Sequence, residues 1–503
     1  MATAAGCHEP AAGSHQPVAG SHEPAAGSYE AAVRDLNRLQ TNHSIIAQIK
    51  ASGGRLNLHS IPEFGAFVEK LGHSVDDLDR LNVIHVAGTK GKGSTCAFVG
   101  SLLAQLRSKS GRRPLKIGLY TSPHLIEARE RIQIDGAPVS HATFAKYFYE
   151  TYDALRRPDP PLRRVAPESP DMPMYFRFLT LMAFHAFLRE RVDVAIMEVG
   201  VGGEYDSTNV IRRPVVCGIA SIGIDHQNSL GSTLAQIAWH KAGIIKPHVP
   251  VFSVEQHPDA LAVVEQRARD NDAPLHVVAP LPARLELGIP GAHQRANAAL
   301  AVALCRAWIE RTRIELADDA CTDCTELADD AWVARGLRAA RWPGRSQTFV
   351  SPRVPTLTWH VDGAHTIESM AACAQWFGGL DGDAPCVLLF NAAHDRDAGA
   401  LLRTLHEHTA GKCRFIGAVF CPNINRARAD SVNFTVADDA KLQAQHDAAR
   451  VWAQLAQTPT AVVPSINDAV AHVEATYTQP VRVLATGSLH LVGGVLDSAK
   501  GSV

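Results

Sequence analysis

Short apolar runs rich in β-branched residues alternate with amphipathic helical patterns between residues 80 and 254. The runs predicted as strands are Val83–Ala87, Lys116–Tyr120, Val192–Val199, Val215–Ile222 and Val249–Val254. Apolar residues at helical spacing predict one helix over Met174–Arg191, with a face in the core, and a second over residues 291–312. Apolar strands separated by helices are typical of a mostly parallel sheet that helices cover on both faces.

A second alternating series follows a break at residues 342–345, Trp-Pro-Gly-Arg. Its predicted strands lie near Leu357–Val361, Cys386–Phe390, Phe415–Val419 and Val481–Ala485. We therefore expect an α/β protein with a larger domain over residues 29–340 and a smaller, Rossmann-like α/β domain over residues 341–503. Active sites in such sheets lie at the carboxyl ends of the strands, so the loops after each strand carry the candidate chemistry.

Two segments have no pattern that could pack. Residues 1–28 repeat units such as His-Glu-Pro-Ala-Ala-Gly-Ser, which contain almost no large apolar side chain, so we expect a disordered low-complexity tail. The sequence Glu-Leu-Ala-Asp-Asp-Ala occurs at 315–320 and again at 326–331, and we interpret it as a duplicated acidic loop insertion.

Composition narrows the class of protein. The chain has 503 residues, of which 46% are hydrophobic and 20% charged, with a formal net charge of −2. These values are typical of a soluble globular protein, and they argue against nucleic acid as a partner and against a membrane span. The 10 cysteines are scattered and no secretory apolar region is present, so we expect reduced thiols inside a cell. The isolated C-x-x-C at Cys321 and Cys324 predicts neither a zinc nor a redox site.

A glycine-rich loop joins the first predicted strand to a helix. Backbone N–H groups of Gly91, Lys92, Gly93 and Ser94 would surround one point at the positive end of that helix, where Lys92 adds a mobile charge. A nucleotide polyphosphate is the natural occupant. The strict Walker pattern is not met, because Gly93 separates Lys92 from Ser94. A merely structural turn is the less favoured alternative, because two lysines and three glycines fall within residues 88–93.

Polar residues follow the other strands of this series. Glu198 ends an apolar strand, where a carboxylate needs a cation, and near a phosphate loop that cation is typically magnesium. The alternative is a salt bridge from Glu198 to a neighbouring Arg or Lys. Ser122, Asp225 and His226 also follow strands. Only the presence of Glu198 at another strand end of the same series favours metal binding over a structural role for them.

Three residues of the second series are candidates of the same kind. Arg345 could be a cation placed between the domains, while Asp362 and Ser488 stand at strand-to-loop junctions that could reach the nucleotide. Their structural alternatives are a hinge arginine, a turn aspartate and a capping serine. The residues alone do not decide between the two interpretations.

Motifs in a fixed order resemble those of the folylpolyglutamate synthase family, of the eukaryotic type, within the ATP-dependent Mur ligase superfamily. The similarity spans roughly residues 29–499. The motifs are Thr-Lys-Gly-Lys-Gly-Ser-Thr at 89–95, Ser-Pro-His-Leu at 122–125, Glu-Val-Gly-Val-Gly-Gly at 198–203, Gly-Ile-Asp-His at 223–226, Trp-Pro-Gly-Arg at 342–345 and Asp-Gly-Ala-His at 362–365.

The resemblance implies a P-loop-containing, Mur-ligase-like ATPase domain and an ADP-forming ligase. ATP, Mg²⁺ and optionally a monovalent cation such as K⁺ would be cofactors, with a folate and L-glutamate as substrates. The γ-carboxylate of the last glutamate would attack the γ-phosphate of ATP, and the amino group of a free glutamate would displace phosphate from the acyl phosphate. The resemblance further implies a monomer, and a cytoplasmic location with allowance for a mitochondrial pool.

Residue roles follow from the same resemblance. Gly91 to Ser94 would hold the ATP phosphates, and Asn297, Arg345 and Asp362 would contact the nucleotide. One magnesium would be bound by Ser122 and Glu198, a second by His226, Glu198 and a carbamylated Lys241. The residues implied for catalysis are Lys92, His226, Lys241, His365 and Ser488, the last two facing the incoming glutamate.

Alternatives remain at this point. The neighbours of Lys241 suggest a half-buried helix end, and the alternative to a carbamate is a surface lysine favoured by the helix dipole. A dihydrofolate synthase, which adds the first glutamate to dihydropteroate, is the runner-up among enzymes. A nucleotide-dependent switch or binding module without ligase chemistry is the alternative from another class.

Overall fold

The computed structural model describes residues 25, 27–40, 59–107, 113–312, 331–393, 396–425 and 442–500. Nearly all of the predicted tail, the acidic repeats up to residue 330 and the Cys321–Cys324 pair lie outside these residues. Within the described part, the first helix begins at Tyr29, where the Ser28 hydroxyl accepts a hydrogen bond from the Ala31 N–H. No helix of the described residues is long and apolar enough to cross a bilayer.

The first sheet is mostly parallel and has 8 strands in the order β4-β3-β2-β5-β1-β6-β7-β8. Its four central strands are buried at every position, which explains their continuous apolar runs. Only β3 and β4 run antiparallel to their neighbours. The strands are β1 Ile84–Ala87, β2 Ile117–Tyr120, β3 Ile132–Ile134, β4 Ala137–Pro138, β5 Val194–Glu198, β6 Val216–Ile219, β7 Val251–Val254 and β8 Leu275–Val278.

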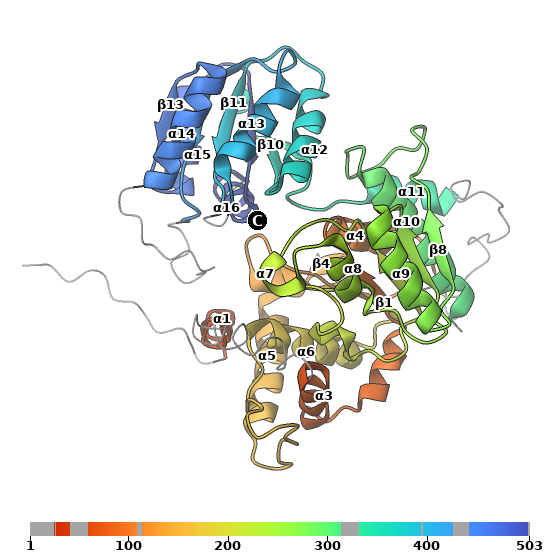
Figure 1. Ribbon diagram of the computed structural model, residues 1–503. Coiled ribbons are helices and arrows are strands. Elements are labelled where there is room, and N and C mark those ends of the chain that lie inside the picture. The colour runs from red at the N-terminus through yellow and green to blue at the C-terminus, as the bar shows by residue number, and fades with distance from the viewer. Residues whose placement is uncertain are drawn as a thin grey trace, which may run out of the picture.

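Helices cover both faces of this sheet, with α4, α10 and α11 packed together on one face and α3, α5 and α6 in the core of the other (Figure 1). Small residues such as Ala298 and Ala301 let α10 approach α4 closely. The helices are α1 Tyr29–Asn37, α3 Ser60–Lys70, α4 Lys92–Leu103, α5 His141–Arg156, α6 Tyr175–Glu190, α7 Gln227–Leu230, α8 Leu234–Ala242, α9 Pro258–Asp270, α10 Gln294–Arg311 and α11 Ala331–Ala339. Short 3₁₀ helices are η2 Val75–Leu81, η3 Ala128–Arg131 and η4 Ser207–Val210.

The second sheet has 6 strands in the order β13-β12-β11-β14-β10-β9, all parallel except β9. Two hydrophobic clusters, one on each face, pack it between α12, α13 and α14 on one side and α15 and α16 on the other (Figure 1). The elements are β9 Gln347–Val350, β10 Leu357–Asp362, β11 Cys386–Phe390, β12 Phe415–Phe420, β13 Thr460–Val462, β14 Val481–Thr486, α12 Ile367–Gly378, α13 Ala398–Thr409, α14 Gln443–Ala456, α15 Ile466–Thr476 and α16 Leu489–Lys500.

Every strand and both helices predicted from the sequence are present, with ends that differ by a few residues. The sequence did not predict β3, β4, β8, β9 or β13, which lie at or next to the sheet edges and are short or only partly buried. The sheets are separate in their strand order, and the division of the chain into domains at residue 340 stays a prediction.

Candidate active site

The glycine-rich loop lies between β1 and α4, as predicted. Gly91 is the N-cap of α4 with φ 86°, a left-handed conformation that favours glycine, and no side chain caps the first turn. The loop is tied to the segment after β6, because the N–H groups of Thr89 and Lys90 donate to the Ser221 carbonyl at 2.7 and 3.1 Å. The uncapped N–H groups at this helix end are therefore available to an anion.

Asn297 and Gln294, on the first turn of α10, line the other side of this loop. A Cβ on Gly91 would collide with the Asn297 side chain, so only glycine allows this approach. Asn297 Nδ2 donates to Gln294 Oε1 at 2.9 Å, and the Gln294 amide lies 3.4 Å from Ser94 Oγ. Asn297 is thus placed beside the phosphate loop, where the resemblance puts a nucleotide contact.

Glu198 brings together the ends of three adjacent strands. Its side chain is 5% exposed, and burial raises the pKa of the carboxyl. Glu198 Oε2 accepts the Ser122 N–H at 3.0 Å, and Oε1 lies 3.9 Å from Lys92 Nζ. The salt-bridge alternative is therefore present, because the cation beside Glu198 is Lys92 of the phosphate loop. It does not compete with the metal-site interpretation, which stays a prediction, because both place Glu198 beside the phosphates.

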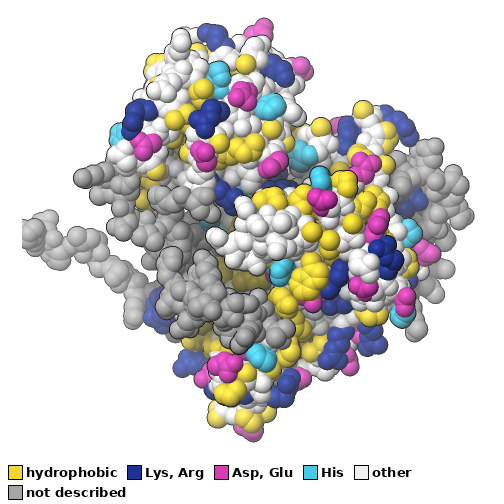
Figure 2. Space-filling view, in the orientation of Figure 1, with side chains coloured by type: hydrophobic (Ala, Val, Ile, Leu, Met, Phe, Trp, Pro, Cys, Tyr) yellow, Lys and Arg dark blue, Asp and Glu magenta, His cyan; other side chains and the backbone are white. Residues whose placement is uncertain are grey.

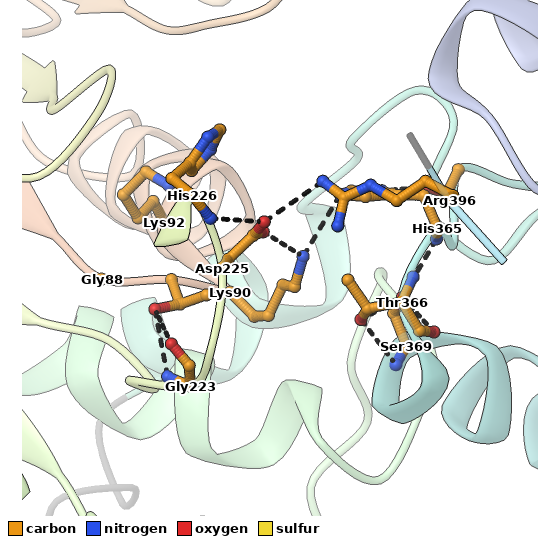
Figure 3. Close-up of polar contacts among 12 residues, drawn as sticks. Gly88, Lys90, Lys92, Gly223, Asp225, His226, His365, Thr366, Ser369 and Arg396 are labelled. Carbon is orange, nitrogen blue, oxygen red and sulfur yellow. Dashed lines mark hydrogen bonds and ion pairs between the residues drawn. The ribbon is translucent and has the colours of Figure 1, made fainter. Parts of the chain in front are cut away.

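Asp225 connects the phosphate loop to the second half of the chain (Figure 3). Its carboxylate accepts from Lys90 Nζ at 3.0 Å and from Arg396 at 3.1 Å. Burial alone would raise the pKa of Asp225, but Lys90, His226 and Arg396 together hold it well below its usual range. Lys90 Nζ is also 3.2 Å from His365 Nε2. From beyond the predicted domain boundary, His365 thus contacts Lys90 of the loop that is expected to hold phosphate, and Arg396 reaches that lysine through Asp225.

His365 and His226 are both held in their neutral form. Burial, followed by the nearby Lys90, lowers the pKa of His365 to about 4. Since His365 Nδ1 lies 3.0 Å from the Gly363 carbonyl, the neutral ring donates there and leaves Nε2 as an acceptor for Lys90. His226 is the N-cap of α7, and burial lowers its pKa as well. Neutral imidazole is the form that can bind a metal ion.

Lys241 is buried, not half-buried or on the surface. Its exposed fraction is 3%, and Nζ donates to the Gly88 carbonyl at 2.8 Å, directly under the phosphate loop. Burial, with a further contribution from Lys92, lowers the pKa of Lys241 to about 7. The helix end was predicted correctly, but one sequence could not show that β1 and α8 meet there.

The second half of the chain contributes Arg345, Asp362 and Ser488. Asp362 Oδ2 accepts the Ser346 N–H at 2.8 Å, so it holds the turn before β9 as a turn aspartate would. Ser488 Oγ accepts the His490 N–H at 3.2 Å, which is the capping alternative. Arg345 Nη1 donates to the Gly344 carbonyl at 3.1 Å, next to Gly363.

One cavity of about 1550 Å³ collects most of the predicted residues, and Figure 2 shows dark blue Lys and Arg side chains in the hollow between the two halves. Lys241 and Ser488 do not line it. The predicted residues that do are Gly91, Lys92, Gly93, Ser94, Ser122, Glu198, His226, Asn297, Arg345, Asp362 and His365. No three His, Cys, Asp or Glu side chains of the described residues form a ready-made metal cage.

Sequence reasoning missed Lys90, Arg396 and Trp342 as site residues. A Cβ on Gly93 would come within 3.1 Å of the Trp342 indole nitrogen, so this ring packs against the phosphate loop. Two of the three carried a signal, because Lys90 is the other lysine of the glycine-rich loop and Trp342 opens a motif already singled out. Arg396 carried none, since it lies 171 residues from its partner Asp225.

Known proteins resemble most of the chain, although it matches no protein-family model. It is 43% identical over 439 residues to a bovine protein named mitochondrial folylpolyglutamate synthase, covering 82% of this chain and 72% of that protein. It is 38% identical over 479 residues to folylpolyglutamate synthase of Saccharomyces cerevisiae strain YJM789, covering 92% and 86%.

Solved structures agree in fold. The structure of Mycobacterium tuberculosis folylpolyglutamate synthase complexed with ADP and AMPPCP has a TM-score of 0.68 and 25% sequence identity, covering 88% of this chain and 96% of that chain. The predicted α/β, Mur-ligase-like fold class is confirmed. Because both curated relatives exceed 30% identity over more than two thirds of their length, the chain belongs to the folylpolyglutamate synthase family.

Proposed function

We propose that this chain is an ATP-dependent, ADP-forming ligase that adds L-glutamate to the γ-carboxylate of the terminal glutamate of a folate. The observation that carries the proposal is the single cavity in which the phosphate loop, Lys92, Glu198 and His365 meet. A nucleotide switch would need the phosphate loop but not a cavity of this size shared with the second sheet. The family of the chain supports the same reaction.

The residues address the main obstacle of the reaction, which is that a carboxylate must approach a triphosphate. Lys92 and the N–H groups of Gly91 to Ser94 would stabilise negative charge on the phosphates. The substrate γ-carboxylate attacks the γ-phosphorus, the bond to ADP breaks, and an acyl phosphate forms. The amino group of glutamate then attacks the acyl carbon and phosphate leaves. Asn297, Arg345 and Asp362 would orient the nucleotide from the two sides of the cavity.

Mg²⁺ fits the buried end of β5. Glu198 receives one N–H and one lysine at 3.9 Å, which leaves carboxylate oxygen free for a hard cation. Ser122 and Glu198 would hold one ion, and His226 with Glu198 and a carbamylated Lys241 a second, with phosphate oxygens and water completing each shell. When bound, magnesium would screen and align the phosphates.

The incoming glutamate would approach from the second sheet. His365 lines the cavity with a neutral ring, and its pKa of about 4 makes it a weak base, so it would position glutamate rather than take its proton. Ser488 is the weaker candidate, because its hydroxyl caps α16 and does not line the cavity. We keep it as a proposed glutamate contact that would require the cap to open.

Product analysis tests the substrate class. Tetrahydrofolate or dihydropteroate is incubated with ATP, Mg²⁺, glutamate and the protein, and products are identified by mass spectrometry. We expect γ-linked glutamyl extension of tetrahydrofolate. Glutamylation of dihydropteroate alone would indicate a dihydrofolate synthase instead.

Relatives named mitochondrial favour a mitochondrial pool beside a cytoplasmic one, and a monomer is our proposal for the assembly.

Replacing Lys241 with alanine is expected to abolish most activity, with partial recovery in acetate. The pKa of about 7 leaves much of the amine neutral at physiological pH, and the neutral amine is the form that reacts with CO₂. Acetate would supply the carboxylate that the carbamate otherwise provides. Turnover of Lys241→Ala with and without acetate is the measurement.

Lys246→Ala is the matched control, because Lys246 is a half-buried lysine that follows α8 and donates to the Asn209 carbonyl at 3.3 Å, away from the loop. We expect this variant to keep near-normal turnover. If Lys241→Ala is as active as wild type in bicarbonate-free buffer, or is inactive with no recovery in acetate or formate, the carbamate is excluded.

A further inference from the structure

A second cluster of chemically competent side chains lies at the far end of the second sheet. Cys386 begins β11 at its amino end, whereas the candidate active site follows the carboxyl ends of the strands. Cys413 lies in the turn between α13 and β12, and the Cys386 N–H donates to the carbonyl of the adjacent Arg414 at 2.8 Å. Arg482 pairs with Cys386 from the neighbouring strand β14. The three side chains therefore meet on one face of the sheet.

Arg482 holds both sulfur atoms with one nitrogen. Its Nη2 lies 3.4 Å from Cys386 Sγ and 3.7 Å from Cys413 Sγ. Its Nη1 donates to the Leu380 carbonyl at 3.0 Å, and the guanidinium lies 4.9 Å from the centre of the Phe377 ring. No other residue of the described chain competes for Nη2.

This arginine needs an anion that no carboxylate provides. Arg482 is 7% exposed, and its Nε is buried without a hydrogen-bond partner. Among the ion pairs of the described residues none joins Arg482 to an Asp or Glu. A buried guanidinium without a counterion is costly, so the partner that geometry offers is a thiolate. A hydrogen bond from the Cys413 thiol, together with Arg482, lowers the pKa of Cys386 to about 6, and the same hydrogen bond raises the pKa of Cys413.

The other cysteines of the described chain lack this environment. Each is buried, and burial raises its pKa above the usual range of a thiol. They are Cys96, Cys217, Cys305, Cys373 and Cys421. Cys413 is the one described cysteine that is partly exposed. Reagents in solvent therefore reach the cluster through Cys413, behind which Cys386 and Arg482 are buried.

We propose that Cys386 and Cys413 form a reversible disulfide with each other by exchange with small-molecule disulfides. Arg482 is the group that activates the pair. The site is separate from the ligase machinery and does not depend on the proposed function. A nearby guanidinium and a paired second thiol are the features that distinguish reactive cysteines from inert buried ones.

The exchange consumes one external disulfide. In the minor form of the pair, in which the shared proton sits on Cys386, the Cys413 thiolate stays beside Arg482 and attacks one sulfur of glutathione disulfide, whose S–S bond breaks to release a first glutathione thiolate. Cys386 then gives its proton to that thiolate and attacks the Cys413 sulfur, releasing the second glutathione. The two electrons lost by the cysteine pair reduce one glutathione disulfide to two glutathiones.

Peptide mass spectrometry after oxidation with glutathione disulfide tests the proposal. The full chain is used with Cys7, Cys321 and Cys324 replaced by serine, since these lie outside the described residues. We expect a peptide pair joined through Cys386 and Cys413 that dithiothreitol separates, with the five buried cysteines unmodified. Free thiols at both positions, or a stable glutathione adduct on Cys413, would overturn it.

Single variants test the order of attack. In Cys386→Ser, Cys413 should retain glutathione, because the resolving sulfur is missing. In Cys413→Ser, Cys386 should stay unmodified, because it is buried. Adducts on Cys386 in the second variant would contradict entry through Cys413.

Arg482→Met tests the activating role with two readouts. Loss of the cation should slow disulfide formation about tenfold, because less thiolate is present near neutral pH. The disulfide should nevertheless persist in more reducing glutathione buffers, because the thiolate form is no longer stabilised. An arginine with only a structural role would not, when replaced, both slow disulfide formation and make the disulfide harder to reduce. If the methionine variant does not fold, Arg482→Lys, which keeps a charge without the fork, should show an intermediate rate, and an unchanged rate would contradict the proposal.

Discussion

Replacing Lys92 with alanine is expected to lower turnover by about a thousandfold at saturating ATP. Lys92 Nζ lies 3.9 Å from Glu198 Oε1 and its side chain is only 15% exposed, so its charge acts in a water-poor part of the cavity. In the transition state that charge would stabilise the phosphoryl group in transfer, an interaction that water cannot replace. Initial rates of folate glutamylation measure the effect.

Two further variants separate charge from position. Lys92→Arg should recover little activity, because a planar fork does not fit a loop built around a point charge. Lys116→Ala should stay within about twofold of wild type, because Lys116 pairs with Glu190 at the amino end of β2 and does not line the cavity. Near wild-type turnover of Lys92→Ala would remove Lys92 from the mechanism.

Replacing Glu198 with glutamine should have a comparable effect, a loss of about a thousandfold in turnover. Glutamine preserves the shape of the side chain and removes the charge that the proposed magnesium ions need. Higher Mg²⁺ concentration should recover part of the loss. Glu190→Gln, which removes a carboxylate from the opposite end of the sheet, is the matched control and should keep normal turnover.

Stability gives Glu198→Gln a second readout. Burial raises the pKa of Glu198 above its unfolded value, so the ionised form weighs against the folded state at neutral pH. The melting temperature of the free protein should therefore be unchanged or higher in the variant, while the added stability from Mg²⁺ and ATP should be lost. A large drop in the melting temperature without ligands would indicate a structural role instead.

The fold was predictable where burial is complete. Runs such as Val194–Glu198 and Cys386–Phe390 are buried at every position and therefore read as continuous apolar sequence. Gln347–Val350 alternates between half-buried and exposed positions, and Leu275–Val278 is buried only at its last residue. These strands are fixed by the neighbour that they pair with, which a local pattern does not contain.

The site was predictable as a set of loops but not as a set of contacts. The phosphate loop and Glu198 were recognisable because glycine, lysine and a strand-end carboxylate are informative residue types. The partners of Asp225 were not, because Lys90 and Arg396 reach it from segments 135 and 171 residues away. Lys241 shows the same limit, since its burial depends on Gly88, which is 153 residues distant.

The stoichiometry of ADP release and glutamyl transfer tests the central claim most directly. Purified protein is mixed with ATP, Mg²⁺, a tetrahydrofolate substrate and labelled glutamate, and both products are quantified over time. We predict one ADP for each new γ-glutamyl bond, with little ADP formed when glutamate or the folate is omitted. ADP release that continues without either substrate, or with no glutamyl product, would show a nucleotide hydrolase or switch and would contradict the assignment.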